Sequence, residues 1–238
     1  MKRNSIALLC MAITAVPAFA EDGIKSSVEL GMVMTSGNSE TQSTNAKASV
    51  EMTKAKWRSA ASLEALNVTG DVNGETKRLS EKYQGAGKVS YLFSEHAYSF
   101  LAADGIHDPF SGYSYQVSSA LGAGYRVINQ KAMVFDVEGG PGFRQSKVRG
   151  SDETLDEGMF RIGAKFTYNI SETSAFSEEF TADIGEESTI SKSVTALTAQ
   201  VAGNLAMKAS LTIKNNDKPA PGADETDSEL GVNLVYSF

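Results

Sequence analysis

The stretch that most constrains the fold is the last one, Ser228–Phe238, because apolar and polar residues alternate along it. One face would carry Leu230, Val232, Leu234, Tyr236 and Phe238, and the other Glu229, Gly231, Asn233, Val235 and Ser237. Successive side chains of a strand point to opposite faces, so the pattern predicts a β-strand with one apolar face and an aromatic end. An ordinary edge strand of a soluble sheet would show the same alternation, and the remaining sequence has to decide.

The other end of the chain has the features of an export signal. Lys2 and Arg3 precede an apolar run from residue 6 to 16, and an A-x-A pattern ends at Ala20. These features predict a secretory signal peptide over residues 1–20, cleaved after Ala20, and a single mature domain over residues 21–238. The only cysteine, Cys10, lies inside the signal, so the mature chain offers neither a disulfide nor a thiol nucleophile.

Charge and hydropathy exclude two classes of protein. Two of the 22 basic residues lie in the signal. The mature chain therefore has 20 basic and 29 acidic residues, a net charge of −9. A nucleic-acid-binding protein would need a basic stripe instead, and we expect no nucleic-acid partner. No apolar run of about 18 residues occurs outside the signal, so the sequence predicts no membrane-spanning helix.

Strand patterns recur along the whole mature chain. The expected strands are 24–35, 41–53, 56–69, 76–93, 96–106, 112–127, 131–145, 156–169, 174–185, 190–204, 206–215 and 226–238. Short turns alternate with longer links, the latter at 70–75, 146–155 and 216–225. Long loops at one end and tight turns at the other are typical of outer-membrane barrels. We therefore predict an all-β fold, a transmembrane antiparallel up-and-down β-barrel of about twelve strands.

The expected strands have an apolar outer face with aromatic residues near the short turns. These aromatics, predicted to form a girdle at one membrane interface, are Trp57, Tyr91, Phe93, Tyr98, Phe100, Tyr168, Phe176 and Tyr236. Two places fit poorly. The segment 96–106 alternates weakly beyond Phe100, and Glu178 falls on the lipid face of 174–185 unless a bulge shifts the register.

Several stretches together resemble a known family. TSGNSETQST (35–44), SSALGAGYRVI (118–128), VEGGPGFR (137–144) and the ending LVYSF are similar, in this order, to the YdiY-like salt-induced outer-membrane proteins. The resemblance implies an outer-membrane barrel associated by name with high salt, and it supplies no catalytic residues. The final strand also resembles the closing strand of outer-membrane barrels, so Tyr236 and Phe238 are the expected signal for the barrel assembly machinery.

The polar face of the expected strands is rich in charge. Its acidic residues are Glu29, Glu51, Glu64, Asp136, Glu138, Glu179, Asp183 and Glu229, and its basic residues are Lys47, Arg58, Lys88, Arg144, Arg161, Lys165, Lys208 and Lys214. About sixteen strands are needed for a wide aqueous pore. Buried charges must be paired or hydrated. A twelve-stranded barrel is therefore expected to have a narrow, hydrated lumen, which either conducts ions and small solutes or is only filled and rigidified by these charges.

Two other function classes remain open. A lipid-acting hydrolase at the barrel rim would use His107 and Ser111, although Asp108-Pro109 and Ser111-Gly112 read more simply as turn formers. A purely structural or adhesin-like barrel would function through its loops. The acidic loops 151–157 and 223–229 are expected to be solvated rather than to bind calcium. The sequence predicts no catalytic residue, cofactor or metal site, and outer-membrane lipid with ions or small solutes as partners.

Overall fold

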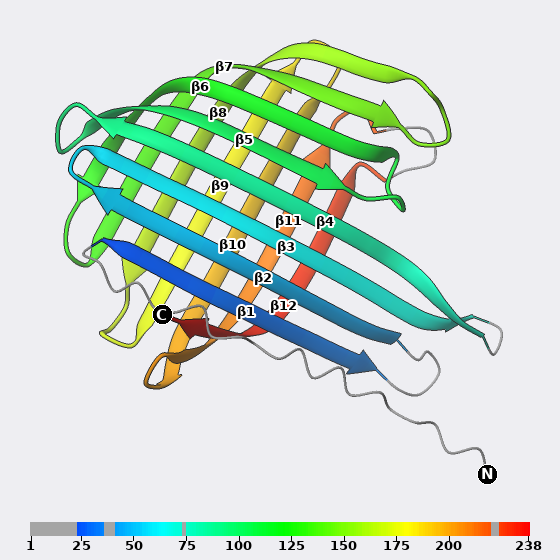
Figure 1. Ribbon diagram of the computed structural model, residues 1–238, viewed down its shortest axis with the longest axis horizontal. Coiled ribbons are helices and arrows are strands. Elements are labelled where there is room, and N and C mark those ends of the chain that lie inside the picture. Colours follow the sequence, from blue (N-terminus) through cyan, green and yellow to red (C-terminus); the bar gives the residue numbers. More distant parts are fainter. Residues whose placement is uncertain (1–22, 36–40, 73–74, 220–223) are drawn as a thin grey trace.

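The computed structural model describes residues 23–35, 41–72, 75–219 and 224–238. Its strands are β1 (Ile24–Thr35), β2 (Thr41–Lys54), β3 (Trp57–Val72), β4 (Glu75–Leu92), β5 (Ala97–His107), β6 (Tyr113–Asn129), β7 (Met133–Val148), β8 (Thr154–Asn169), β9 (Ser174–Gly185), β10 (Thr189–Ala202), β11 (Leu205–Asn216) and β12 (Thr226–Ser237). Each pairs with the next in antiparallel fashion, and β12 pairs with β1 (Figure 1). The predicted closed barrel is confirmed. The expected signal peptide lies outside the described residues.

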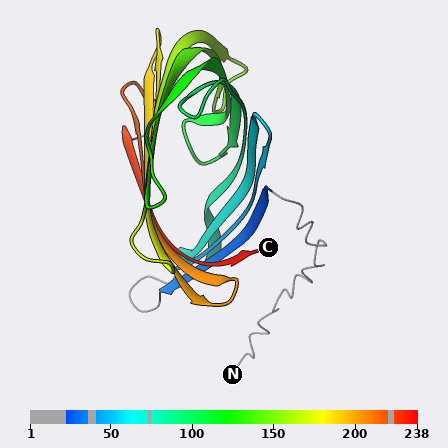
Figure 2. The ribbon, with the colours of Figure 1, turned by 90° about the vertical axis from the view of Figure 1, so that its left-hand side faces the viewer.

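The barrel is flattened rather than round. Figure 2 shows an elongated cross-section, in which the wall of β2–β5 faces the wall of β9–β11. Closure gives every strand two neighbours, as a sheet that crosses a membrane needs, although the seam between β1 and β12 pairs only Ser27–Gly31 with Asn233–Ser237. Across the described ranges, no helix is long and apolar enough to span a bilayer. Flattening brings opposite walls close enough for long side chains to meet across the interior.

The links between strands differ from the expected lengths. The expected link at 70–75 is wrong, because β3 and β4 stay paired up to Val72 and Glu75. The expected link 146–155 is shortened to 149–153, since Lys147 still pairs with Thr154. In both cases cross-strand hydrogen bonding continues through residues that look like turn formers in the sequence. The link after β11 does span 217–225.

The outer face of the barrel is apolar and exposed. Large apolar side chains that point outward include Leu30, Val50, Leu63, Leu101, Leu121, Phe160, Leu197, Val232 and Leu230, the last 75% exposed. Soluble monomers rarely expose a continuous apolar surface of this extent, whereas a bilayer solvates it. The outer surface is therefore that of a transmembrane barrel.

Two members of the expected aromatic girdle lie elsewhere. Trp57, Tyr91 and Phe93 form edge-to-face pairs on the outer face. The placement of Tyr98 and Phe100 in this girdle was wrong, because both point into the barrel and are 4% exposed. Their cross-strand partners on β6 are Gly124 and Gly122.

The glycines on β6 explain why these aromatic rings turn inward. A Cβ atom at Gly124 would overlap the ring of Tyr98, so only glycine leaves room for this ring on the inner wall. The inward assignment also accounts for the weak alternation of segment 96–106. Phe100, Ala102 and Asp104 all face the lumen, so its inner face is part apolar and part charged.

Glu178 keeps its outward position without a bulge. It pairs with Phe166 on β8 and Thr195 on β10 in a regular register. Its carboxylate accepts hydrogen bonds from the hydroxyl groups of Ser193 (2.6 Å) and Thr195. These two donors partly replace the water that the carboxylate loses on the lipid-facing surface.

Candidate functional site

The candidate site is the barrel lumen. Residues opposite each other in neighbouring strands share a face, so the registers fix which side chains point inward. They place on the inner face all of the residues predicted for the lumen, namely Glu29, Lys47, Glu51, Arg58, Glu64, Lys88, Asp136, Glu138, Arg144, Arg161, Lys165, Glu229, Glu179, Asp183, Lys208 and Lys214. Inward charges not predicted for the lumen include Lys25, Lys82, Asp104, Arg126, Glu157, Lys192 and Asp227. The alternation of inward and outward positions along each strand would have been enough to identify these charges from the sequence.

A cluster near the short turns fills the space between β3 and β7. The guanidinium carbon of Arg58 lies 5.1 Å from the ring centre of Tyr98, and Nζ of Lys88 lies 5.0 Å from that of Phe100. The Tyr98 hydroxyl donates to Glu138 at 3.0 Å, and Glu138 also pairs with Lys88. Cation–π contacts and ion pairs here stabilise each other in a space with little water.

Arg126 and Asp136 extend this cluster toward β8. Nε and Nη2 of Arg126 donate to both carboxylate oxygens of Asp136, at 2.9 and 3.1 Å. Arg58 approaches the same carboxylate to 3.7 Å from the far side. Asp136 therefore links strands β3, β6 and β7 across the lumen.

Arg161 holds three strands together at the centre of the barrel. Its Nε and Nη2 each donate to Asp183 on β9 at 2.6 Å, and its Nη1 donates to Asp104 on β5 at 2.7 Å. The Arg161 and Asp183 side chains are 9% and 12% exposed. An ion pair so well shielded from water stabilises the barrel only when each charged group keeps its partner.

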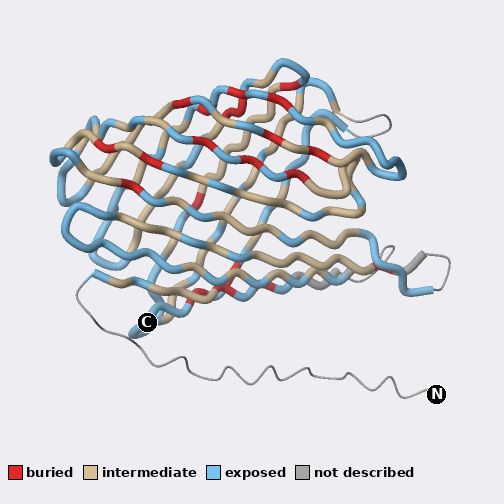
Figure 3. The backbone as a smooth tube through the Cα atoms, turned by 45° about the horizontal axis from the view of Figure 1, so that its top comes forward, coloured by how far each residue is buried: buried red, intermediate tan, exposed pale blue. Residues whose placement is uncertain are grey.

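Arg144 forms a second enclosed ion pair, toward the longer loops. Its side chain is almost fully buried, and Nε donates to Glu157 at 2.8 Å. Nη2 donates to the carbonyl of Ser188, in the link between β9 and β10, at 2.6 Å. Figure 3 shows buried residues gathered along β5–β8, where these clusters lie. One side of the lumen is thus packed.

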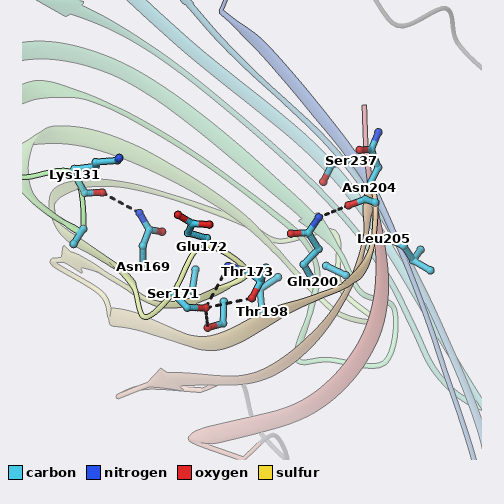
Figure 4. A pocket seen from close by; sticks show the side chains of 15 residues that line it. Lys131, Asn169, Ser171, Glu172, Thr173, Thr198, Gln200, Asn204, Leu205 and Ser237 are labelled. Atoms are coloured by element: carbon cyan, nitrogen blue, oxygen red, sulfur yellow. Dashed lines mark hydrogen bonds between the residues drawn. The ribbon is translucent and has the colours of Figure 1, made fainter.

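The opposite side is open at the short-turn end. A cavity of about 780 Å³ lies there, and we call it the vestibule. It is lined by Lys131, Ala132, Asn169, Ser171, Glu172, Thr173, Ser174, Ala175, Thr198, Gln200, Gly203, Asn204, Leu205, Ala206 and Ser237 (Figure 4). Asn169 and Gln200 donate to the backbone carbonyls of Lys131 and Gly203, which fixes two turns at its edge. Small and polar side chains predominate among the residues that line this entrance.

One ion pair of the lumen is much more hydrated than the others. Lys165 and Glu179 lie farther along the strands that supply Asn169 and Ala175 to the vestibule. Their closest charged atoms are 3.7 Å apart, and their side chains are 54% and 55% exposed. Both side chains point inward, so their exposed surface faces the lumen and not the lipid. The vestibule therefore continues into a wet part of the lumen.

Tyr236 and Phe238 lie on the outer side of the closing strand. Their rings pack edge to face with centres 4.9 Å apart. The backbone N–H of Phe238 donates to the carbonyl of Ser26 at 2.9 Å, which extends the seam between β12 and β1. Recognition of these aromatics by the assembly machinery stays a prediction.

The residues expected for a hydrolase form a turn instead. The Ser111 hydroxyl donates to the carbonyl of Tyr113 at 2.7 Å. The Asp108 carboxylate accepts from the backbone N–H groups of Phe110 and Ser111, at 2.9 and 3.0 Å. The cross-strand partners of His107 are Tyr83 and Tyr115, on the outer face, and not Ser111. Within the described ranges, no group of three or more His, Cys, Asp and Glu residues could hold a metal ion.

A closed twelve-stranded barrel with an apolar exterior and a charged interior is a bacterial outer-membrane type of β-barrel. Residues 28–238 match the family described as "Protein of unknown function, DUF481", and the chain belongs to this family. It is 25% identical over 223 residues to "Uncharacterized protein YdiY" of Escherichia coli (strain K12), covering 93% of this chain and 86% of that protein. The resemblance to YdiY-like proteins is thus confirmed.

Solved structures share the fold at low sequence identity. An outer membrane channel from Pseudomonas putida F1 superposes with a TM-score of 0.54 and 8% identity, covering 91% of this chain and 95% of that one. The NanC porin superposes with a TM-score of 0.52 and 11% identity, covering 90% and 98%. At such identities the likeness establishes the barrel architecture alone.

Proposed function

We propose that this protein is a non-enzymatic outer-membrane channel of low conductance for ions or small hydrophilic solutes. The observation that carries the proposal is the half-exposed, inward-pointing Lys165–Glu179 pair beyond the vestibule. Charges that only rigidified the barrel would gain most by being enclosed and fully hydrogen-bonded, as Arg161 and Asp183 are. A half-exposed pair instead lies where water and ions can pass.

The packed side of the lumen limits the size of the solute. Twelve strands enclose much less space than the sixteen to eighteen of open porins. The cluster around Tyr98 and the ion pairs of Arg161 and Arg144 occupy part of that space. The remaining path therefore runs along β8–β12 and suits small hydrated solutes.

The proposal places the short turns and the vestibule at the periplasmic side. Short turns face the periplasm in bacterial outer-membrane barrels, and the longer links face outward. The links between β5 and β6 and between β7 and β8 would then face the exterior. A channel for ions in this membrane agrees with the high-salt association that the resemblance to YdiY-like proteins implies, and a role in osmotic stress is part of the proposal.

Conductance of the purified protein in planar bilayers tests this function. We expect small single-channel steps in KCl, and Glu179→Gln is expected to shift the permeability ratio by about twofold toward anions, because Lys165 then acts without its carboxylate. The matched control is Glu178→Gln on the same strand, whose side chain points outward. It should leave the permeability ratio unchanged. A correctly folded barrel without conductance would favour the structural reading of these charges.

A further inference from the structure

Two lysines face each other on the inner wall without a carboxylate between them. Lys192 on β10 and Lys214 on β11 are direct cross-strand partners. Like charges in this position destabilise a sheet. Among the residues that the structure describes, neither ammonium group has a carboxylate oxygen within 4.0 Å. An arrangement that costs stability in the empty barrel indicates a ligand or a functional role.

The other lysines of the same wall region each have a carboxylate partner. Their closest charged atoms lie 2.5 Å apart for Lys82–Glu229, 3.0 Å for Lys208–Glu29, and 3.7 Å for both Lys47–Glu64 and Lys165–Glu179. Most inward lysines are thus paired with a carboxylate. Lys25, opposite Glu51 at the end of β1, also lacks an ion pair but is exposed, so Lys192 and Lys214 are the exceptions away from that end.

The unpaired lysines lie where the two walls of the barrel meet. Nζ of Lys214 reaches across the lumen from β11 to β6 and donates to Oε1 of Gln116 at 3.3 Å. Lys82 reaches from β4 to β12 to contact Glu229. Lys82 is close enough for its charge to act on both Lys192 and Lys214. The charge of Lys47 acts on Lys192 as well. We call the part of the lumen near Lys82, Lys192 and Lys214, which come from three strands, the lysine constriction.

Carboxylates also face the lysine constriction, but most have other partners. Glu64 and Glu179 act on Lys192, and each is closest to another lysine. Asp108 and Asp227 act on Lys214. The Asp108 carboxylate accepts two backbone N–H groups in its turn.

Asp227 lies near the end of β12 and is exposed. It is the cross-strand partner of Lys214, yet it forms no ion pair with it within 4.0 Å. Water at the rim screens this carboxylate. The space between Lys192 and Lys214 therefore lacks a bound negative charge of its own.

We propose that Lys192 and Lys214, with the charge of Lys82 nearby, bind the carboxylate or phosphate group of a small anionic solute inside the lumen. Two ammonium groups from adjacent strands can donate to two oxygens of one oxyanion, with the Gln116 side chain released from Lys214. The binding of the anion stands on this geometry alone. Its consequence, a channel that passes anions in preference to cations, rests on the proposed function.

The test uses the double variant Lys192→Gln/Lys214→Gln and the control Lys54→Gln, an exposed lysine outside the lumen. In a KCl gradient, the unmodified channel is expected to pass chloride in preference to potassium. The double variant should lower the chloride-to-potassium permeability ratio by about threefold or more, and the control should not. Removing two like charges is expected to preserve folding, which heat-modifiable migration on gels checks.

Two measurements separate the failure of this inference from that of the channel function. If the unmodified channel prefers cations, or if the double variant has the same permeability ratio as the unmodified channel, the proposed anion selectivity is wrong. The proposed channel function would stand in either case. Titration with inorganic phosphate in micelles, followed by ¹⁵N–¹H spectra, tests binding even in a barrel that does not conduct. Shifts around Lys192 and Lys214 that disappear in the double variant support the site, and their absence in the unmodified barrel refutes it.

Discussion

Replacement of Arg161 by methionine is expected to lower the free energy of unfolding by about 3–5 kcal/mol, the cost of breaking an enclosed ion pair from one side. Arg161 donates two hydrogen bonds to Asp183 and one to Asp104. Methionine has similar length but no charge, so Asp183 would remain enclosed without a cation. Denaturant titration of the refolded barrel in micelles, at neutral pH, measures the change.

The matched control for this prediction lies on the same strand. Lys165→Met also removes one partner of an inward ion pair, but the Lys165 and Glu179 side chains are half exposed and keep contact with water. We expect it to cost about 0–1 kcal/mol, as for exposed pairs in general. Equal losses in the two variants would mean that water reaches the centre of the barrel as freely as it reaches Lys165.

Lysine at Leu211 is expected to destabilise the barrel by about 2–4 kcal/mol, because hydrocarbon cannot solvate an ammonium group at mid-depth. Leu211 lies near the middle of β11 and points outward. Equilibrium unfolding in lipid bilayers is the appropriate measurement, since detergent adapts more easily to a charged side chain.

The neighbouring residue on β11 supplies the control for depth. Thr212 points inward and is the cross-strand partner of Glu229. Lysine at this position would gain a nearby carboxylate and lumen water, so Thr212→Lys should cost about 1 kcal/mol or less. The reversed order of the two variants would show that β11 is turned by one residue, and equal tolerance would argue against a lipid-facing wall.

The packed and the hydrated parts of the lumen have different physical consequences. The cluster around Tyr98 and the Arg161 ion pairs connect β3–β9 and resist deformation, because each charge has several fixed partners. The vestibule and the Lys165–Glu179 pair leave the path along β8–β12 open to water. In the proposed channel, stability and permeation would therefore be assigned to opposite sides of one barrel.

The sequence by itself determined the strands and their faces. Alternation with a period of two is a local property, so it can be read without knowing which strands pair. It identified the outward positions of Leu230 and Val232 and the inward positions of Arg144 and Arg161. It also placed Glu178 on the outer face, where the structure has it.

Only the tertiary structure decided how the inward residues are arranged. The inward turn of Tyr98 depends on Gly124, a residue of the next strand whose missing side chain leaves space for the ring. The contact of Lys214 with Gln116 joins strands that are far apart in the sequence and meet because the closed barrel is flattened. Periodicity fixes the face of most side chains, but barrel closure and stagger fix their partners, and these decide which charges stay unpaired.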